Sequence, residues 1–130
     1  LLNEAKDQCK KTLQNKKIIH MLIQNYLIDN DNYNFLPNEI KCNFFSLDIK
    51  FICLPNDLVK IFEKVLNKYH ISINQLLSAN YLEDYFNNNE IDIFNKASRV
   101  IDGCNINEVK IINKIPKKSG IFERFFSIFS

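Results

Sequence analysis

Two stretches of the chain have hydrophobic periodicities that predict different secondary structures. From 44 to 54 apolar side chains recur at every second position from 45 to 53, and polar ones stand at 46, 48 and 50. This alternation predicts a strand with one buried face. From 57 to 69 the apolar residues recur at helical spacing, namely Leu58, Ile61, Phe62, Val65, Leu66 and Tyr69. This second pattern predicts an amphipathic helix, and Pro55-Asn56-Asp57 ends the strand and offers an N-cap.

Weaker patterns predict the remaining elements. We expect a helix over 1–13, a strand over 18–28, a loop over 29–34, a strand over 71–77, a short helix over 90–100 and a short strand over 109–115. From 1 to 77 the order is helix, strand, strand, helix, strand. This order favours an α+β fold, with a small antiparallel sheet packed with helices on one face as a two-layer sandwich.

The C-terminal residues 120–130 separate apolar from polar side chains completely. On a helix, one face holds Ile121, Phe122, Phe125, Phe126, Ile128 and Phe129. Residues 114–130 have a net charge of +3, and the basic side chains beside the face include Lys117, Lys118 and Arg124. Phenylalanines beside basic residues favour a reversible anchor on an anionic membrane surface. The alternative is that this helix folds back onto the domain as part of its core.

Composition excludes several classes of function. The net charge is only +2, so no global basic field favours a nucleic-acid partner. With two glycines in the chain, most phosphate-binding loops are excluded, and we expect no ATP binding. The first residues lack the pattern of a signal peptide, and the longest apolar run is too short to span a bilayer. We therefore expect a cytoplasmic protein with reduced thiols.

We find no catalytic, cofactor or metal motif in the sequence. The four cysteines lie far apart, without the spacing of a zinc site. The acidic segment 29–34 lacks the glycine and the glutamate of a calcium loop, so we interpret it as a turn. Glu83 and Asp84 are expected to lie on a solvated helix face, and His20 to be a satisfied or surface histidine. These patterns predict a protein that is not an enzyme.

Three motifs follow one another in residues 1–86. The first is the segment from Ile18 to Asp29, with His20 and Tyr26, the second is the pattern from Leu47 through Tyr69, and the third is 77–81. In order and spacing they resemble the strand, the strand and helix, and the closing element of the 1C (SHS2-type) subdomain in the FtsA family of bacterial actin-like cell-division proteins. A C-terminal amphipathic membrane-targeting helix is also a feature of this family. The chain departs from the family at 70, where a histidine replaces the usual glycine, and it lacks the ATP-binding, actin-like subdomains.

The resemblance implies three regions and a role. Residues 1–86 would form the SHS2-like interaction domain, 87–118 a linker and 119–130 the membrane-targeting helix. The family's function implies an adaptor that binds divisome proteins, or itself, on the inner face of the bacterial plasma membrane. The sheet and the helix over 57–69 would present the protein-binding face. The alternatives are a soluble interaction module of the same superfamily, of the pilus-assembly type, and a decayed gene product without activity.

Overall fold

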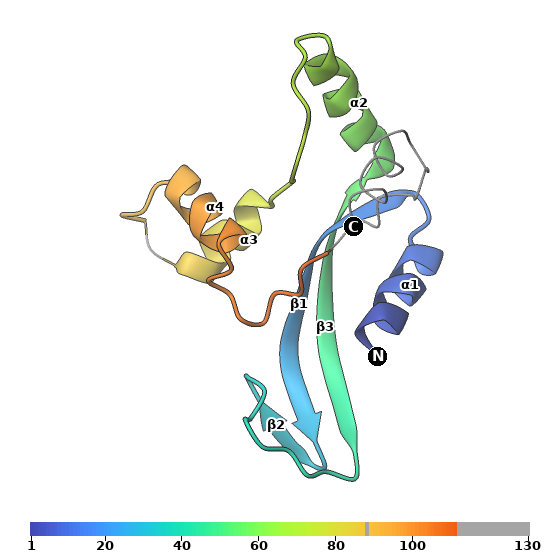
Figure 1. Ribbon diagram of the computed structural model, residues 1–130, viewed down its shortest axis with the longest axis vertical. Helices are drawn as coiled ribbons and strands as arrows, with labels where there is room; N and C mark the ends of the chain where they lie inside the picture. The colour runs from blue at the N-terminus through green and yellow to red at the C-terminus, as the bar shows by residue number, and fades with distance from the viewer. Residues whose placement is uncertain (88, 112–130) are drawn as a thin grey trace, which may run out of the picture.

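The computed structural model describes residues 1–87 and 89–111. Over these residues the chain is α+β, with a small three-stranded antiparallel sheet and four helices (Figure 1). The elements in chain order are α1 (Leu2–Thr12), β1 (Lys16–Ile28), β2 (Asp31–Tyr33), β3 (Phe45–Pro55), α2 (Asn56–Asn67), α3 (Ala79–Phe86) and α4 (Ile93–Ile101). The expected fold class is confirmed at this level.

The sheet is a long ribbon of two strands with a short third strand at one end. β1 lies between β2 and β3 and pairs with β3 along its whole length, from Lys16 opposite Pro55 to Ile28 opposite Phe45. Two register shifts interrupt this pairing, after Ile18 and after Ile23. Because a bulge bends and twists a strand pair, these shifts account for curvature of the ribbon (Figure 1).

The predicted loop over 29–34 is only partly correct, because 31–33 form β2. The turn that precedes β2 begins at Asp29, which adopts a positive φ of 53°. The Asp29 carboxylate accepts the backbone N–H groups of Asn43 (2.9 Å) and Phe44 (3.0 Å). An aspartate tolerates this backbone conformation because its short side chain bonds nearby N–H groups. Asp29 thus fixes both the hairpin and the start of β3.

The hydrophobic core forms where α3 and α4 pack against β1. Its central cluster is Leu22, Tyr81, Leu82 and Val100, with Ile52, Leu77, Phe86, Ile93 and Ala97 packed around it. In Figure 1, α3 and α4 lie on one side of the ribbon and α1 on the other. The three large side chains Leu22, Tyr81 and Leu82 are each less than 9% exposed, so the centre of β1 is the best-covered part of the sheet.

The predicted strand over 71–77 is wrong. Residues 71–78 run as an extended connection from α2 to α3 without strand pairing (Figure 1). A strand requires a neighbour for its N–H and C=O groups. β3 leads directly into α2, which carries the chain beyond the end of the ribbon before this segment begins, so alternation alone did not produce a strand.

The predicted N-cap of the helix after β3 is correct in position, because Pro55 is the N-cap residue of α2, but it forms no capping hydrogen bond. The helix begins at Asn56, and neither Pro55 nor Asn56 caps it through a side chain. Asn56 instead donates to the carbonyl of Gln14 (3.4 Å). Asp57 lies in the first turn, where its negative charge interacts favourably with the helix dipole.

Residues beyond the proposed boundary at 86 contribute to the same core. The expected helix over 90–100 is present as α4, and Asp92 caps it by accepting the N–H groups of Phe94 and Asn95. Val100 of α4 belongs to the central cluster. The boundary at 86 stays a prediction, but the described part of the expected linker 87–118 contains a packed helix.

Two predictions fall wholly or partly outside the described residues. Of the strand expected over 109–115, residues 109–111 form no strand, and 112–115 lie outside the description. The adjacent Glu108 forms an isolated bridge with Leu22. The amphipathic helix predicted over 119–130 also lies outside the described residues. The same holds for the membrane-binding residues predicted there and for Lys117 and Lys118.

Candidate functional site

A row of exposed apolar side chains lies along α2. We call it the α2 face and define it by Leu58, Ile61, Phe62 and Val65 of the helix and by Tyr69 just after its end, which are all exposed. Ile61 is 58% exposed and Phe62 47%, whereas Val59, on the flank of this face, is only 4% exposed. Single exposed apolar residues are ordinary on a protein surface, but a contiguous stripe marks an interaction site.

The position of α2 explains why this face is uncovered. The helix follows β3 without a break and extends past the end of the ribbon (Figure 1). It contacts β1 and β3, and Val59 is its one fully buried residue. An amphipathic helix normally turns its apolar face to the core. Of the apolar residues predicted for this helix, those of the α2 face are exposed and Leu66 is half-buried. No element within the described residues covers the α2 face.

The end of α2 has a defined geometry that directs the chain away from this face. His70 adopts a positive φ of 58°. The Ile71 N–H bonds the Leu66 carbonyl (3.1 Å), and the His70 N–H bonds the Asn67 carbonyl (3.1 Å). These bonds form a Schellman motif, in which glycine is the usual left-handed residue. The histidine noted in the sequence therefore occupies a position that costs it backbone strain.

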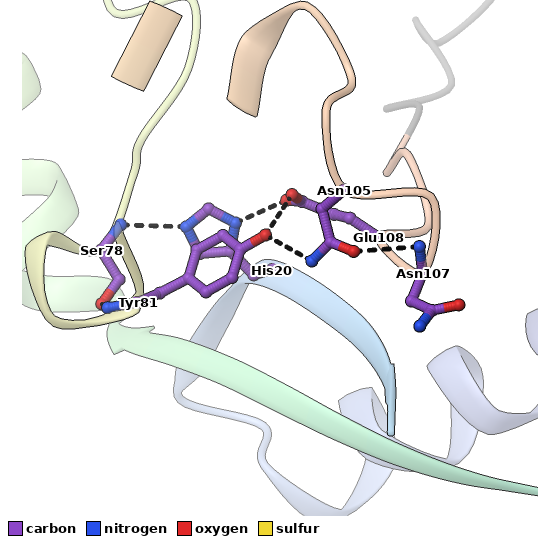
Figure 2. A network of polar contacts seen from close by, with 6 residues as sticks. All are labelled: His20, Ser78, Tyr81, Asn105, Asn107 and Glu108. Carbon is purple, nitrogen blue, oxygen red and sulfur yellow. Dashed lines mark hydrogen bonds and ion pairs between the residues drawn. The ribbon is translucent and has the colours of Figure 1, made fainter. Parts of the chain in front are cut away.

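The second distinctive feature is a buried polar network around His20, which is 1% exposed (Figure 2). The Ser78 N–H donates to His20 Nε2 (2.9 Å), so Nε2 is the acceptor nitrogen. The other nitrogen, Nδ1, therefore carries the proton and donates to Glu108 Oε1 (2.7 Å). Both ring nitrogens are occupied, which confirms the prediction of a satisfied histidine and leaves neither nitrogen free to act as a base.

Residues 105–109, which we call the strap, complete this network (Figure 2). Glu108 Oε2 accepts the Tyr81 hydroxyl (2.8 Å), and Asn105 donates to the same hydroxyl oxygen (2.8 Å). Asn107 accepts the Tyr26 hydroxyl (3.0 Å). Burial raises the pKa of Tyr81 well above its usual value, and the hydrogen bond to Glu108 contributes to the rise. The phenol thus stays protonated as a donor.

Backbone hydrogen bonds fix the strap to β1 as well. The Ile23 N–H bonds the Asn107 carbonyl (2.9 Å), and the Val109 N–H bonds the Met21 carbonyl (2.9 Å). The network therefore joins β1, the start of α3 and the strap. Every buried side-chain N or O atom in the described part of the chain has a partner. We interpret the network as a structural clamp rather than a reaction centre.

Two further contacts are not evident from the sequence. The pKa of the Cys53 thiol is raised by burial and, to a smaller extent, by the neighbouring Cys9 thiol of α1. Lys96 of α4 is 1% exposed and pairs with Glu83 of α3 at 2.5 Å. The solvated face expected for Glu83 and Asp84 is thus only partly correct, because Glu83 neutralises a buried lysine. Across 1–87 and 89–111, no three His, Cys, Asp or Glu side chains gather as a metal site.

Comparisons with protein-family models, with curated proteins and with solved structures find no match to this chain. No helix within the described residues is long and apolar enough to cross a membrane. The site is therefore interpreted from its geometry. Of the predicted features, the apolar residues of α2 are brought together on one exposed face. The clamp was missed because its partners are separated by up to 88 residues in sequence, and only His20 within a strand gave any indication of it.

Proposed function

We propose that this chain is a protein-interaction adaptor that binds its partner through the α2 face. The observation that carries the proposal is the exposure of Ile61, Phe62 and Val65 on one side of a helix that is anchored at the flank of this face by Val59. Apolar residues at this spacing dock into, or against, a complementary apolar partner surface. Both nitrogens of the one buried histidine are occupied, which is compatible with a binding role and gives no support to a catalytic one.

The finer proposal follows the resemblance to the FtsA family. The chain would act as a divisome adaptor with an SHS2-like domain, at the cytoplasmic face of the bacterial plasma membrane. Its membrane contacts would come from the predicted C-terminal helix, through residues such as Phe125 and Phe126. Weak membrane attachment becomes effective when two binding events are linked in one chain. The proposal thus assigns partner binding to α2 and membrane binding to 119–130.

The two assignments are separable in dividing bacterial cells that express the full chain as a fluorescent fusion. We expect the unaltered chain at the division site. Phe62→Asp should leave the fusion on the membrane but spread it evenly, because only partner binding is lost. Phe125→Asp combined with Phe126→Asp should release it into the cytoplasm. Lys64→Gln on the charged side of α2 is the matched control and should behave as the unaltered chain.

The alternative is a soluble interaction module of the same superfamily. The exposed α2 face also favours this alternative, because it offers an apolar surface on which the predicted Phe-rich C-terminal helix could pack. In that case the fusion would stay in the cytoplasm for the unaltered chain, for Phe62→Asp, and for Phe125→Asp combined with Phe126→Asp. Sedimentation of the full chain with anionic liposomes, compared with Phe125→Asp, then decides between the two. No sedimentation of either protein contradicts the membrane adaptor.

A further inference from the structure

A second surface, independent of the α2 face, lies along the open edge of β1. One edge of β1 pairs with β3 throughout. On the other edge, β2 pairs with Tyr26–Ile28, and the strap bonds Met21 and Ile23. Among the residues that the structure describes, no backbone hydrogen bond reaches this edge from Lys17 to His20. An unpaired strand edge is a template for another extended chain.

A cleft of about 700 Å³ opens at this edge. Its walls come from the first residues of β1, the extended segment 73–76, the end of α4 and the last described residues, 109–111. Apolar side chains in the lining include Ile18, Ile19, Leu76 and Val109. Within the described residues, the cleft therefore combines an unpaired strand edge with apolar surface, which is what a bound β-strand requires.

Positive charge predominates among the side chains that line the cleft. Four lysines contribute to it: Lys10 from α1, Lys16 and Lys17 from β1, and Lys110 after the strap. Among the described residues of the lining, Glu108 is the single acidic one, and its two oxygens already accept from His20 and Tyr81. None of the four lysines forms an ion pair within 1–87 and 89–111. The lysines thus present uncompensated positive charge to an occupant.

We propose that this cleft binds an acidic peptide of a partner protein in extended conformation, added to the free edge of β1. Backbone hydrogen bonds to the edge would give affinity, apolar side chains of the peptide would contact Ile18 and Ile19, and acidic ones would pair with the lysines. The chain's own C-terminal residues are a poorer occupant, since 114–130 have a net charge of +3. Like charges disfavour their binding among four lysines.

The proposal is tested by fluorescence anisotropy with the full chain and a labelled short peptide that alternates glutamate with valine. We expect saturable binding that weakens as salt is added, because exposed charge pairs are screened. Lys17→Glu combined with Lys110→Glu should weaken binding about tenfold, as expected when two attractive charges become repulsive. The matched control, Lys60→Glu with Lys64→Glu on α2, should bind as the unaltered chain does. Circular dichroism confirms that each variant is folded.

Two further probes distinguish strand addition from simple charge attraction. A lysine–valine peptide should not bind. A glutamate–valine peptide with methylated backbone nitrogens should lose binding, because it keeps its charge but cannot pair with the strand edge. Equal binding of the methylated peptide, equal weakening by the α2 control, or no binding of the glutamate–valine peptide would overturn the proposal. Vesicles of phosphatidylglycerol that compete in a manner dependent on Lys17 and Lys110 would instead assign the cleft to lipid.

Discussion

The centre of β1 and the helix α2, which extends past one end of the ribbon, differ in how completely their apolar side chains are covered. At the centre of β1, α3, α4 and the strap bury Leu22 and Leu82, and they satisfy both nitrogens of His20. At the end that leads into α2, one residue is buried and a full apolar face is exposed. The same kind of amphipathic sequence produced a packed helix in α4 and an uncovered one in α2. Hydrophobic periodicity thus locates the apolar face of a helix but does not show what covers that face.

The largest expected difference between the two regions is in the loss of stability when a large apolar side chain is replaced by alanine. Leu82→Ala should lower the free energy of unfolding by about 3 kcal/mol, because it removes a side chain at the centre of the core and leaves a cavity. Ile61→Ala on the α2 face should change it by less than about 0.5 kcal/mol. Urea unfolding monitored by circular dichroism measures both. Equal losses would contradict the exposure of α2.

A smaller but substantial loss is expected at the clamp. Glu108→Ala should destabilise the fold by about 2 kcal/mol, because the buried donors of His20 and Tyr81 lose their acceptor. The same unfolding experiment measures this, with Glu63→Ala on exposed α2 as the control. If Glu108→Ala proves as mild as the control, the network does not fix the strap to β1.

A gain is expected at the end of α2. His70→Gly should raise stability by about 1 kcal/mol, because glycine adopts the positive φ of this position with less strain. Asn67→Gly, placed within the helix where φ is helical, should instead lower stability. Thermal unfolding of both variants checks the sign. Destabilisation by His70→Gly would show that the Schellman geometry is not the one described.

The smallest effect is a pH dependence at the start of α4. Backbone N–H groups, chiefly that of Asn95, lower the pKa of Asp92. A lowered folded-state pKa means that the stabilisation is present above the ordinary aspartate range and is lost as the pH falls through the folded value. The amide signals of Phe94 and Asn95 in NMR spectra should therefore shift at acid pH. Asp92→Asn should abolish that shift, while Asp84→Asn, at an exposed position of α3, should leave it in place.

Local patterns predicted much of the fold and little of the site. The alternation over 44–54 and the helical spacing over 57–69 depend on neighbours in sequence, and both elements formed. The segment 71–77 alternates as well, but it lacked a pairing partner and stayed extended. The clamp required Glu108 to reach His20 across the fold, which no local pattern encodes. Lys96 likewise appears as an ordinary charged residue until α3 and α4 pack together.

The central claim is that the α2 face is open for a partner while Val59, on the flank of this face, is packed. Thiol labelling tests it directly in the full chain with the four native cysteines replaced by serine. A cysteine is introduced at the exposed position by Ile61→Cys or at the buried one by Val59→Cys, and the rate of maleimide reaction is measured. We predict that Ile61→Cys reacts nearly as fast as in the urea-unfolded chain and that Val59→Cys is strongly protected. Equal protection of both positions would contradict the account, because it would mean that the α2 face is covered in the isolated protein.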